Sequence, residues 1–147
     1  MYTVRNDAFT IDVTTTDMIT IANASTKVLR IHEIRVTQDS SVAAGQTGVR
    51  FLRRTTAGSG GTTATVVKHS TGDATAAFTA TASRTTQGTG GDVLWRESND
   101  ERAGWVHTPT PEKRWEIEPS GIVALCWADT PTAGLVATAE VVVEELG

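Results

Sequence analysis

The run Val28-Leu29-Arg30-Ile31-His32-Glu33-Ile34-Arg35-Val36 decides the fold class of this chain. Apolar and polar residues alternate along it, and a period of two is typical of a β-strand because successive side chains point to opposite faces of a sheet. At its start the run is apolar on both faces. We therefore expect a strand near the middle of a sheet, where both faces are covered.

Nine further runs carry a strand pattern, and clusters of Gly, Pro, Asn, Asp and Ser separate them. The predicted strands are residues 9–13, 19–21, 49–55, 63–69, 93–96, 104–108, 114–118, 121–127 and 135–145. Short strands with turns at this spacing are typical of a β-sandwich or barrel, here of about eight to ten strands. Residues 74–83 are ambiguous, because their alanines tolerate a helix while their Phe and Thr residues fit a strand or a loose excursion.

The composition agrees with an all-β fold. The chain holds 26 threonines among 147 residues, and β-branched side chains lose rotamer freedom in a helix but fit a pleated sheet. A mass of 15.6 kDa is that of one ordinary domain with a core of its own. We therefore expect a single domain over residues 1–147, with Trp95 and Trp127 in its core.

Charge and cysteine content exclude several classes of protein. Lys and Arg number 13 and Asp and Glu number 17, so the net charge is −4. An acidic chain without a basic stripe is a poor nucleic-acid binder, because phosphate neutralisation needs clustered Lys and Arg. No run approaches the roughly 18 apolar residues of a membrane span. One cysteine makes neither an internal disulfide nor a thiolate zinc site.

The first residues, Met1-Tyr2-Thr3-Val4-Arg5-Asn6-Asp7, lack the apolar run of a signal peptide. We therefore expect synthesis in the cytoplasm. We also expect residues 1–7 to be incompletely packed, and so to form an extended arm that reaches a neighbouring molecule.

Four sequence patterns could belong to a catalytic or ligand-binding site, and each has a simpler structural explanation. Residues 58–61 read Gly-Ser-Gly-Gly, but a strand pattern follows them, whereas a phosphate loop needs a following helix. The three histidines lack metal-ligand spacing, and Cys126 lies in an apolar run, where a cysteine is an inert hydrophobe. Glu116 and Glu118 share one face of a short strand. A catalytic acid pair needs a desolvated carboxyl, and nothing in the surrounding sequence would desolvate either of these. We therefore predict no enzymatic activity, no cofactor and no metal site.

Two tryptophans and an arginine pair are candidates for contact with another molecule. Trp105 and Trp115 flank the turn Thr108-Pro109-Thr110-Pro111, where an indole beside rigid prolines would lose little entropy on binding. Packing inside the chain is the open alternative for both. Arg53 and Arg54 place two charges on opposite faces of one strand, either as ion-pair partners at a subunit contact or on a solvated hairpin.

Several runs together resemble small virion proteins of tailed bacteriophages. They are residues 29–38, the arginine-rich strand with the Gly-Thr-Thr turn that follows it, Ala103-Gly104-Trp105, residues 109–114, Pro119-Ser120-Gly121 and residues 143–147. From about residue 10 to the end, the chain resembles a phage capsid decoration, or cement, protein of the jelly-roll type.

The resemblance implies a jelly-roll-like antiparallel β-sandwich that self-associates as a homodimer or homotrimer. It would bind the major capsid protein on the outer surface of the virion and stabilise contacts between capsomers, with neither nucleic acid nor membrane as a partner. We expect the interface to combine the arm with the tryptophans and arginines above: Tyr2, Val4, Arg5, Arg53, Arg54, Trp105 and Trp115. The alternative is a head- or tail-fibre module that binds a host receptor or glycan, with the two tryptophans as stacking platforms.

Overall fold

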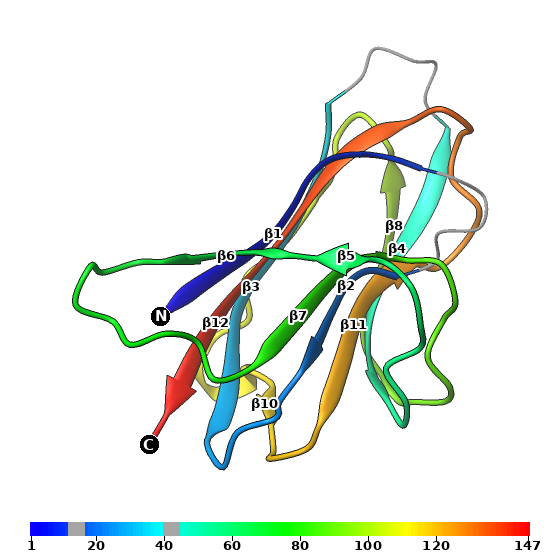
Figure 1. The fold of residues 1–147 in the computed structure, drawn as a ribbon. Helices are drawn as coiled ribbons and strands as arrows, with labels where there is room; N and C mark the ends of the chain where they lie inside the picture. The colour runs from blue at the N-terminus through cyan, green and yellow to red at the C-terminus, as the bar shows by residue number, and fades with distance from the viewer. Residues whose placement is uncertain (12–16, 40–44) are drawn as a thin grey trace.

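A computed structural model describes residues 1–11, 17–39 and 45–147, and within them the regular structure is almost entirely β (Figure 1). The elements are β1 (Tyr2–Thr10), β2 (Asp17–Ala22), β3 (Val28–Gln38), β4 (Gln46–Arg54), β5 (Thr62–Thr63), β6 (Thr65–Lys68), β7 (Thr79–Arg84), β8 (Val93–Asp100), β9 (Trp105–His107), the short 3-10 helix η1 (Pro111–Lys113), β10 (Glu116–Ile117), β11 (Ile122–Trp127) and β12 (Val136–Leu146). The all-β prediction is confirmed.

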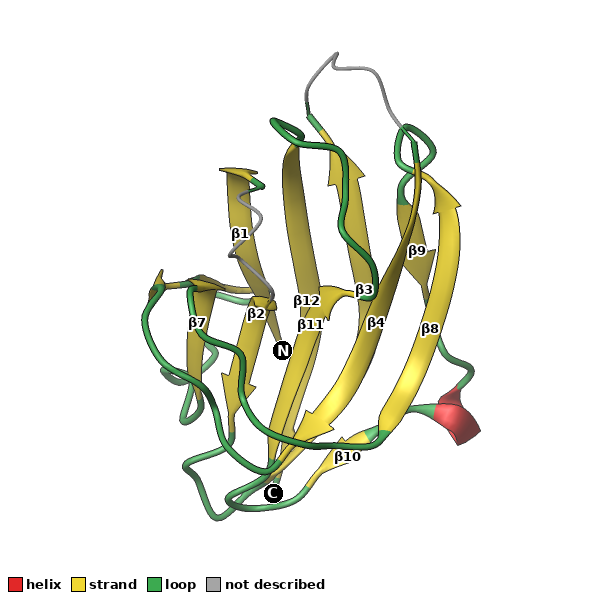
Figure 2. Cartoon of the chain, turned by 90° about the vertical axis from the view of Figure 1, so that its right-hand side faces the viewer, coloured by secondary structure: helices red, strands yellow, loops and turns green. Residues whose placement is uncertain are grey.

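The strands form two antiparallel sheets that pack face to face as a sandwich (Figure 2). Sheet A has the order β10-β3-β12-β1-β6, with β9 also pairing with β3, and sheet B has the order β5-β7-β2-β11-β4-β8. The sandwich prediction is therefore confirmed, whereas the jelly-roll pattern of connections stays a prediction.

The described residues form twelve strands, more than we expected, and the predicted strand at residues 63–69 shows one reason. It breaks at Ala64, which is buried. The residues before the break pair with β7 in sheet B, whereas β6 after it pairs with β1 in sheet A. A run that looks continuous in sequence therefore turns a corner between the two sheets. The ambiguous residues 74–83 enter β7 only from Thr79 onward, and residues 12 and 13 of another predicted strand lie outside the described residues.

Strand β3 is an interior strand, as its sequence pattern predicts, with β10 and β9 on one side and β12 on the other. Its pairing with β12 skips His32, which forms a β-bulge. The bulge changes which residues face the core: Leu29 and Ile31 before it and Ile34 and Val36 after it are all fully buried. The apolar residues that seem to lie on both faces of this strand therefore all face the core, because the bulge reverses the alternation part of the way along it.

The expected arm is wrong, because residues from Tyr2 onward form β1 in the interior of sheet A. This strand pairs with β12 along one edge and with β6 along the other. Tyr2 and Val4 are 3% and 0% exposed, and the Tyr2 hydroxyl donates to the Ala74 carbonyl at 3.1 Å. The alternation of Tyr2 and Val4 with polar neighbours was the signal for this strand.

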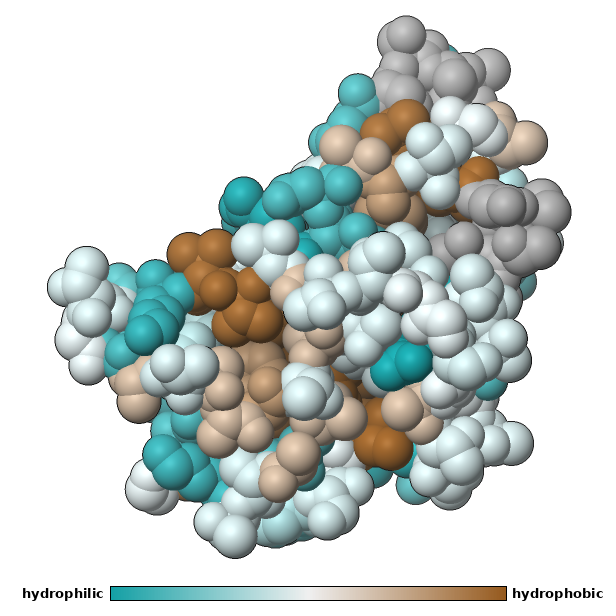
Figure 3. Space-filling view, viewed as in Figure 1, coloured by the Kyte–Doolittle hydropathy of each residue, from teal (hydrophilic) through white to brown (hydrophobic). Residues whose placement is uncertain are grey.

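The core lies between the sheets and includes Trp105 and Trp127, whose rings meet edge to face at 5.6 Å. The surface is mostly polar, although apolar side chains gather over β6 (Figure 3), where Val67 is about half exposed. Within the described ranges, no helix is long and apolar enough to cross a membrane.

Candidate functional site

Four aromatic rings contact one another in series at the side of the sandwich where β8, β9 and β10 lie. Trp95 of β8 stacks on His107 of β9 at 5.0 Å, and His107 stacks on Trp115 at 5.2 Å. Trp115 in turn contacts Phe51 of β4 at 5.4 Å. Because β4 and β8 belong to one sheet and β9 to the other, this aromatic row ties the two sheets together where the sandwich would otherwise be open.

The aromatic row also decides what the predicted stacking platforms do. Trp115 is half-buried against His107 and Phe51, and Trp105 is only 2% exposed. Trp105 is therefore not a surface stacking platform, whereas Trp115 keeps part of its ring at the surface, where it lines a hollow. For Trp105 the open alternative, packing within the core, is what the structure shows.

Burial lowers the pKa of His107 below its ordinary value, and the nearby Glu97 carboxylate acts in the opposite direction. The two neighbouring indoles and the poor access to water favour a neutral imidazole. His107 is therefore an aromatic spacer between two tryptophans at neutral pH.

A hollow of about 400 Å³ opens beside the row, which we call the apolar hollow. It is lined by Leu94, Trp95, His107, Thr108, Pro109, Thr110, Lys113 and Trp115. Two apolar side chains on the same two strands are also exposed, Val93 at 53% and Val106 at 57%. Aromatic and aliphatic side chains gathered at a surface hollow are typical of protein contact sites.

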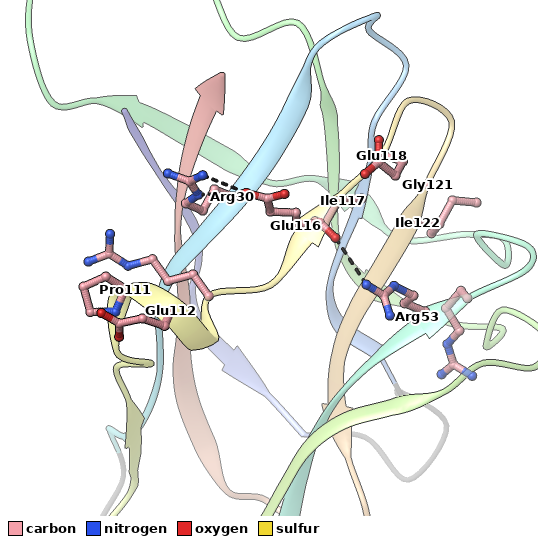
Figure 4. A pocket seen from close by; sticks show the side chains of 11 residues that line it. Arg30, Arg53, Pro111, Glu112, Glu116, Ile117, Glu118, Gly121 and Ile122 are labelled. Atoms are coloured by element: carbon pink, nitrogen blue, oxygen red, sulfur yellow. Dashed lines mark hydrogen bonds and ion pairs between the residues drawn. The ribbon is translucent and has the colours of Figure 1, made fainter. Parts of the chain in front are cut away.

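A second hollow of about 630 Å³ lies on the other side of η1 and has a different chemistry (Figure 4). Four arginines and three glutamates line this arginine hollow: Arg30, Arg53, Arg54, Arg114, Glu112, Glu116 and Glu118. Arg30 reaches across from β3 to the Glu116 carboxylate, with Nη2 at 2.7 Å from Oε1. Arg53 comes from β4 on the facing sheet and donates to the Glu116 backbone carbonyl at 3.3 Å.

The four guanidinium groups are not equally satisfied. Arg54 forms a buried ion pair with Asp17, with 2.7 Å between Nη2 and Oδ1. The side chains of Arg54 and Asp17 are 6% and 0% exposed. Arg30 is neutralised by Glu116. Arg53 and Arg114 have no carboxylate partner in the described part of the chain, and the Arg114 Nε is buried without a hydrogen-bond acceptor there. Two positive charges in this hollow are thus available to an added anion.

Residues 109–116 form a ridge between the two hollows. Pro111, Glu112, Arg114 and Glu116 line the arginine hollow, whereas Pro109, Thr110, Lys113 and Trp115 line the apolar one. The backbone is extended at Arg114, with φ −64° and ψ 135°, so neighbouring side chains point to opposite sides. A backbone hydrogen bond of 2.9 Å from Ile31 to the Trp115 carbonyl anchors the ridge to β3.

The predicted interface residues are therefore divided. Arg53 lines the arginine hollow and Trp115 the apolar hollow on the other side of the ridge, while Arg54 lines the arginine hollow but is paired with the buried Asp17. The predictions for Tyr2, Val4 and Trp105 are wrong, because their side chains are buried within the chain. Arg5 lies on β1, away from the ridge, where its Nε donates to Glu140 at 2.6 Å and this contact raises the pKa of Arg5.

Sequence reasoning missed Leu94, Trp95, His107 and Arg114 as parts of this site. The prediction that Trp95 lies in the core is wrong, because its indole is only partly buried and packs against the core from the side of the apolar hollow. His107 lies in the predicted strand at residues 104–108, where its ring stacks between two tryptophans. The one usable signal was the proline-rich turn, since it marks the chain between His107 and Trp115 as rigid and exposed.

Three other titratable groups contact partners within the chain. Burial raises the pKa of the Cys126 thiol, although Arg50 donates to its sulfur at 3.3 Å and opposes the effect. His32 pairs with Glu144 at 2.9 Å, and His69 contacts the Thr3 hydroxyl at 2.8 Å. Across the described ranges, no group of three or more His, Cys, Asp or Glu residues is arranged to hold a metal ion.

Comparison with known proteins found no match to this chain among protein-family models, curated proteins or solved structures.

Proposed function

We propose that this chain is a virion structural protein that binds the outer surface of a tailed-phage capsid and stabilises contacts between capsomers of the major capsid protein. The family resemblance supplies the partner. The observation that carries a binding role is the ridge at residues 109–116 with a hollow on either side. In Figure 2 the helix η1 of this ridge projects from the side of the sandwich, next to β8, β9 and β10.

The chemistry of the ridge supports protein contact. Interfaces are enriched in aromatic residues and arginine, and their strongest contacts lie in preformed pockets. Here Trp95, Trp115 and Arg53 gather around two such hollows. The aromatic row holds the site against both sheets, so binding would freeze few additional rotamers.

A capsid-bound bridge stabilises an expanded shell only through a difference in affinity. If the two capsomer surfaces reach their correct spacing only after expansion, the protein binds that state more tightly and shifts the equilibrium toward it. Self-association as a homodimer or homotrimer would multiply weak contacts through avidity. The outer edge of β8, which ends sheet B, is available for such an association.

The test is co-sedimentation of the purified protein with empty capsids of the phage that encodes it, before and after expansion. We expect binding to expanded capsids and little binding to unexpanded ones. Equal binding to both would overturn the stabilising role, and no binding to either would overturn the capsid partner. Light scattering over a dilution series checks the oligomer, since a persistent monomer would contradict the homodimer or homotrimer.

A further inference from the structure

We infer that the ridge at residues 109–116 docks an extended peptide segment that carries one carboxylate side chain and one apolar side chain, one for each hollow. The inference relies on the proposed function for the source of the segment, a neighbouring virion protein, but not for its chemistry. The juxtaposition of two unlike hollows across a single stretch of chain is the observation from which it starts.

The arginine hollow selects the carboxylate. Arg53 and Arg114 lack an acidic partner among the described residues, and a guanidinium binds a carboxylate through paired, charge-assisted hydrogen bonds. The incoming carboxylate meets the terminal guanidinium nitrogens of these arginines, because the Arg114 Nε itself is buried.

The same hollow limits the partner to one acidic group. Glu112 and Glu118 also line it, and Glu116 is already engaged by Arg30. A polyacidic segment would meet these carboxylates and be repelled, since like charges in a partly desolvated site are unfavourable. The arrangement therefore discriminates against generic acidic polymers, including nucleic acid.

The apolar hollow selects the second side chain. Leu94, Pro109 and the edges of the two indoles offer an apolar lining, and Lys113 is the one fully charged side chain among the residues that line it. A volume of about 400 Å³ accommodates an aliphatic or aromatic side chain with part of its backbone. We place both side chains on one segment, since an extended segment that crosses the ridge reaches the hollow on either side.

The experiment is selection of a random linear-peptide library on the immobilised full chain, followed by anisotropy titration of an enriched peptide. We expect enriched sequences with a single Asp or Glu and one apolar residue at a constant spacing. The double variant Arg53→Gln, Arg114→Gln should weaken binding about tenfold to a hundredfold, which is the effect of losing charged hydrogen bonds. The matched control Lys68→Gln, Arg102→Gln removes the same charge from exposed positions elsewhere and should leave affinity unchanged.

A second pair of variants tests the other hollow. Thr110→Arg places a long side chain at the exposed rim of the apolar hollow and should abolish selection for the apolar residue, whereas Thr62→Arg on the far edge of sheet B should not. Thermal unfolding checks that each variant is folded. Peptides without an acidic residue, or equal losses in the two control variants, would overturn the inference. Capsid binding without such peptide selection would overturn it and leave the proposed function standing, while peptide selection without capsid binding would do the reverse.

Discussion

The buried ion pair between Asp17 and Arg54 gives the most direct test of the packing beneath the site. The Asp17 carboxylate is fully buried and the Arg54 side chain is 6% exposed, with 2.7 Å between Oδ1 and Nη2. Arg54 also donates to the Gly88 carbonyl at 2.9 Å. The pair joins β2 to β4 across β11, so its loss would disturb three adjacent strands of sheet B.

The expected magnitude follows from this burial. An exposed ion pair contributes at most about 1 kcal/mol, whereas removing one partner of a buried pair costs about 3–5 kcal/mol because the other charge stays in a dry environment. Asp17→Asn should lie near 3 kcal/mol, since the Gly88 carbonyl still accepts from Arg54. Arg54→Met should lie near the upper limit, because the Asp17 carboxylate keeps no partner for its charge.

Chemical denaturation of both single variants and of the double variant measures these values. Removing both charges should cost clearly less than the sum of the single changes, by more than about 1 kcal/mol. At roughly 2–4 °C per kcal/mol for a domain of this size, Asp17→Asn should lower Tm by about 6–12 °C. Arg96→Gln, which breaks a surface pair with Asp129 that is about half exposed on both sides, is the control and should cost under about 1 kcal/mol. Additive single changes, or a cost for Asp17→Asn no larger than the control, would refute the reasoning.

Three further predictions concern the site and its neighbourhood. Burial lowers the pKa of His107 in the folded protein, so folding stability should be unaffected by this group above the pKa of the unfolded chain, near 6.5, and should fall as the pH drops from there toward the folded pKa. An NMR titration of His107 should give a midpoint below 6.5. Glu97→Gln should lower that midpoint further, because the Glu97 carboxylate raises the pKa. Gly91→Ala should destabilise by more than about 3 kcal/mol, because φ is +124° and a Cβ there would lie 1.3 Å from a carbonyl oxygen of β4; Gly134→Ala, with φ +78° and open space around it, should cost only about 1–2 kcal/mol in thermal or chemical unfolding. The buried Cys126 thiol, whose pKa is raised, should react with a thiol reagent at pH 8 only after denaturant is added, and fast labelling of the folded protein would contradict its burial.

Local sequence patterns were sufficient for most of the strands and for much of the core. The period-two alternation of residues 28–36 predicted a strand, and the structure forms β3 there, with partners on both sides. This succeeds because side-chain alternation is a property of the extended backbone itself and needs no knowledge of neighbours. The same reasoning failed for the bulge at His32, because a bulge depends on the length and register of the partner strand.

Long-range pairing decided what local patterns left open. The first residues looked like a free arm until β12 and β6 were found on either side of them, and the run at residues 63–69 looked like one strand until its halves paired in different sheets. Neither outcome is visible in a short window, since each depends on residues far away in the sequence.

The candidate site shows the same division between sequence and structure. The sequence determined that this is a β protein with a rigid, proline-rich turn between residues 107 and 115. Only the tertiary structure brought Phe51 and Trp95 of one sheet against His107 of the other and Trp115 beside it, and placed Arg53 across from Arg114 at the same ridge. The physical reason is that strand propensity depends on residues that are neighbours in sequence, whereas a site between two sheets depends on which distant side chains come into contact when the sheets pack.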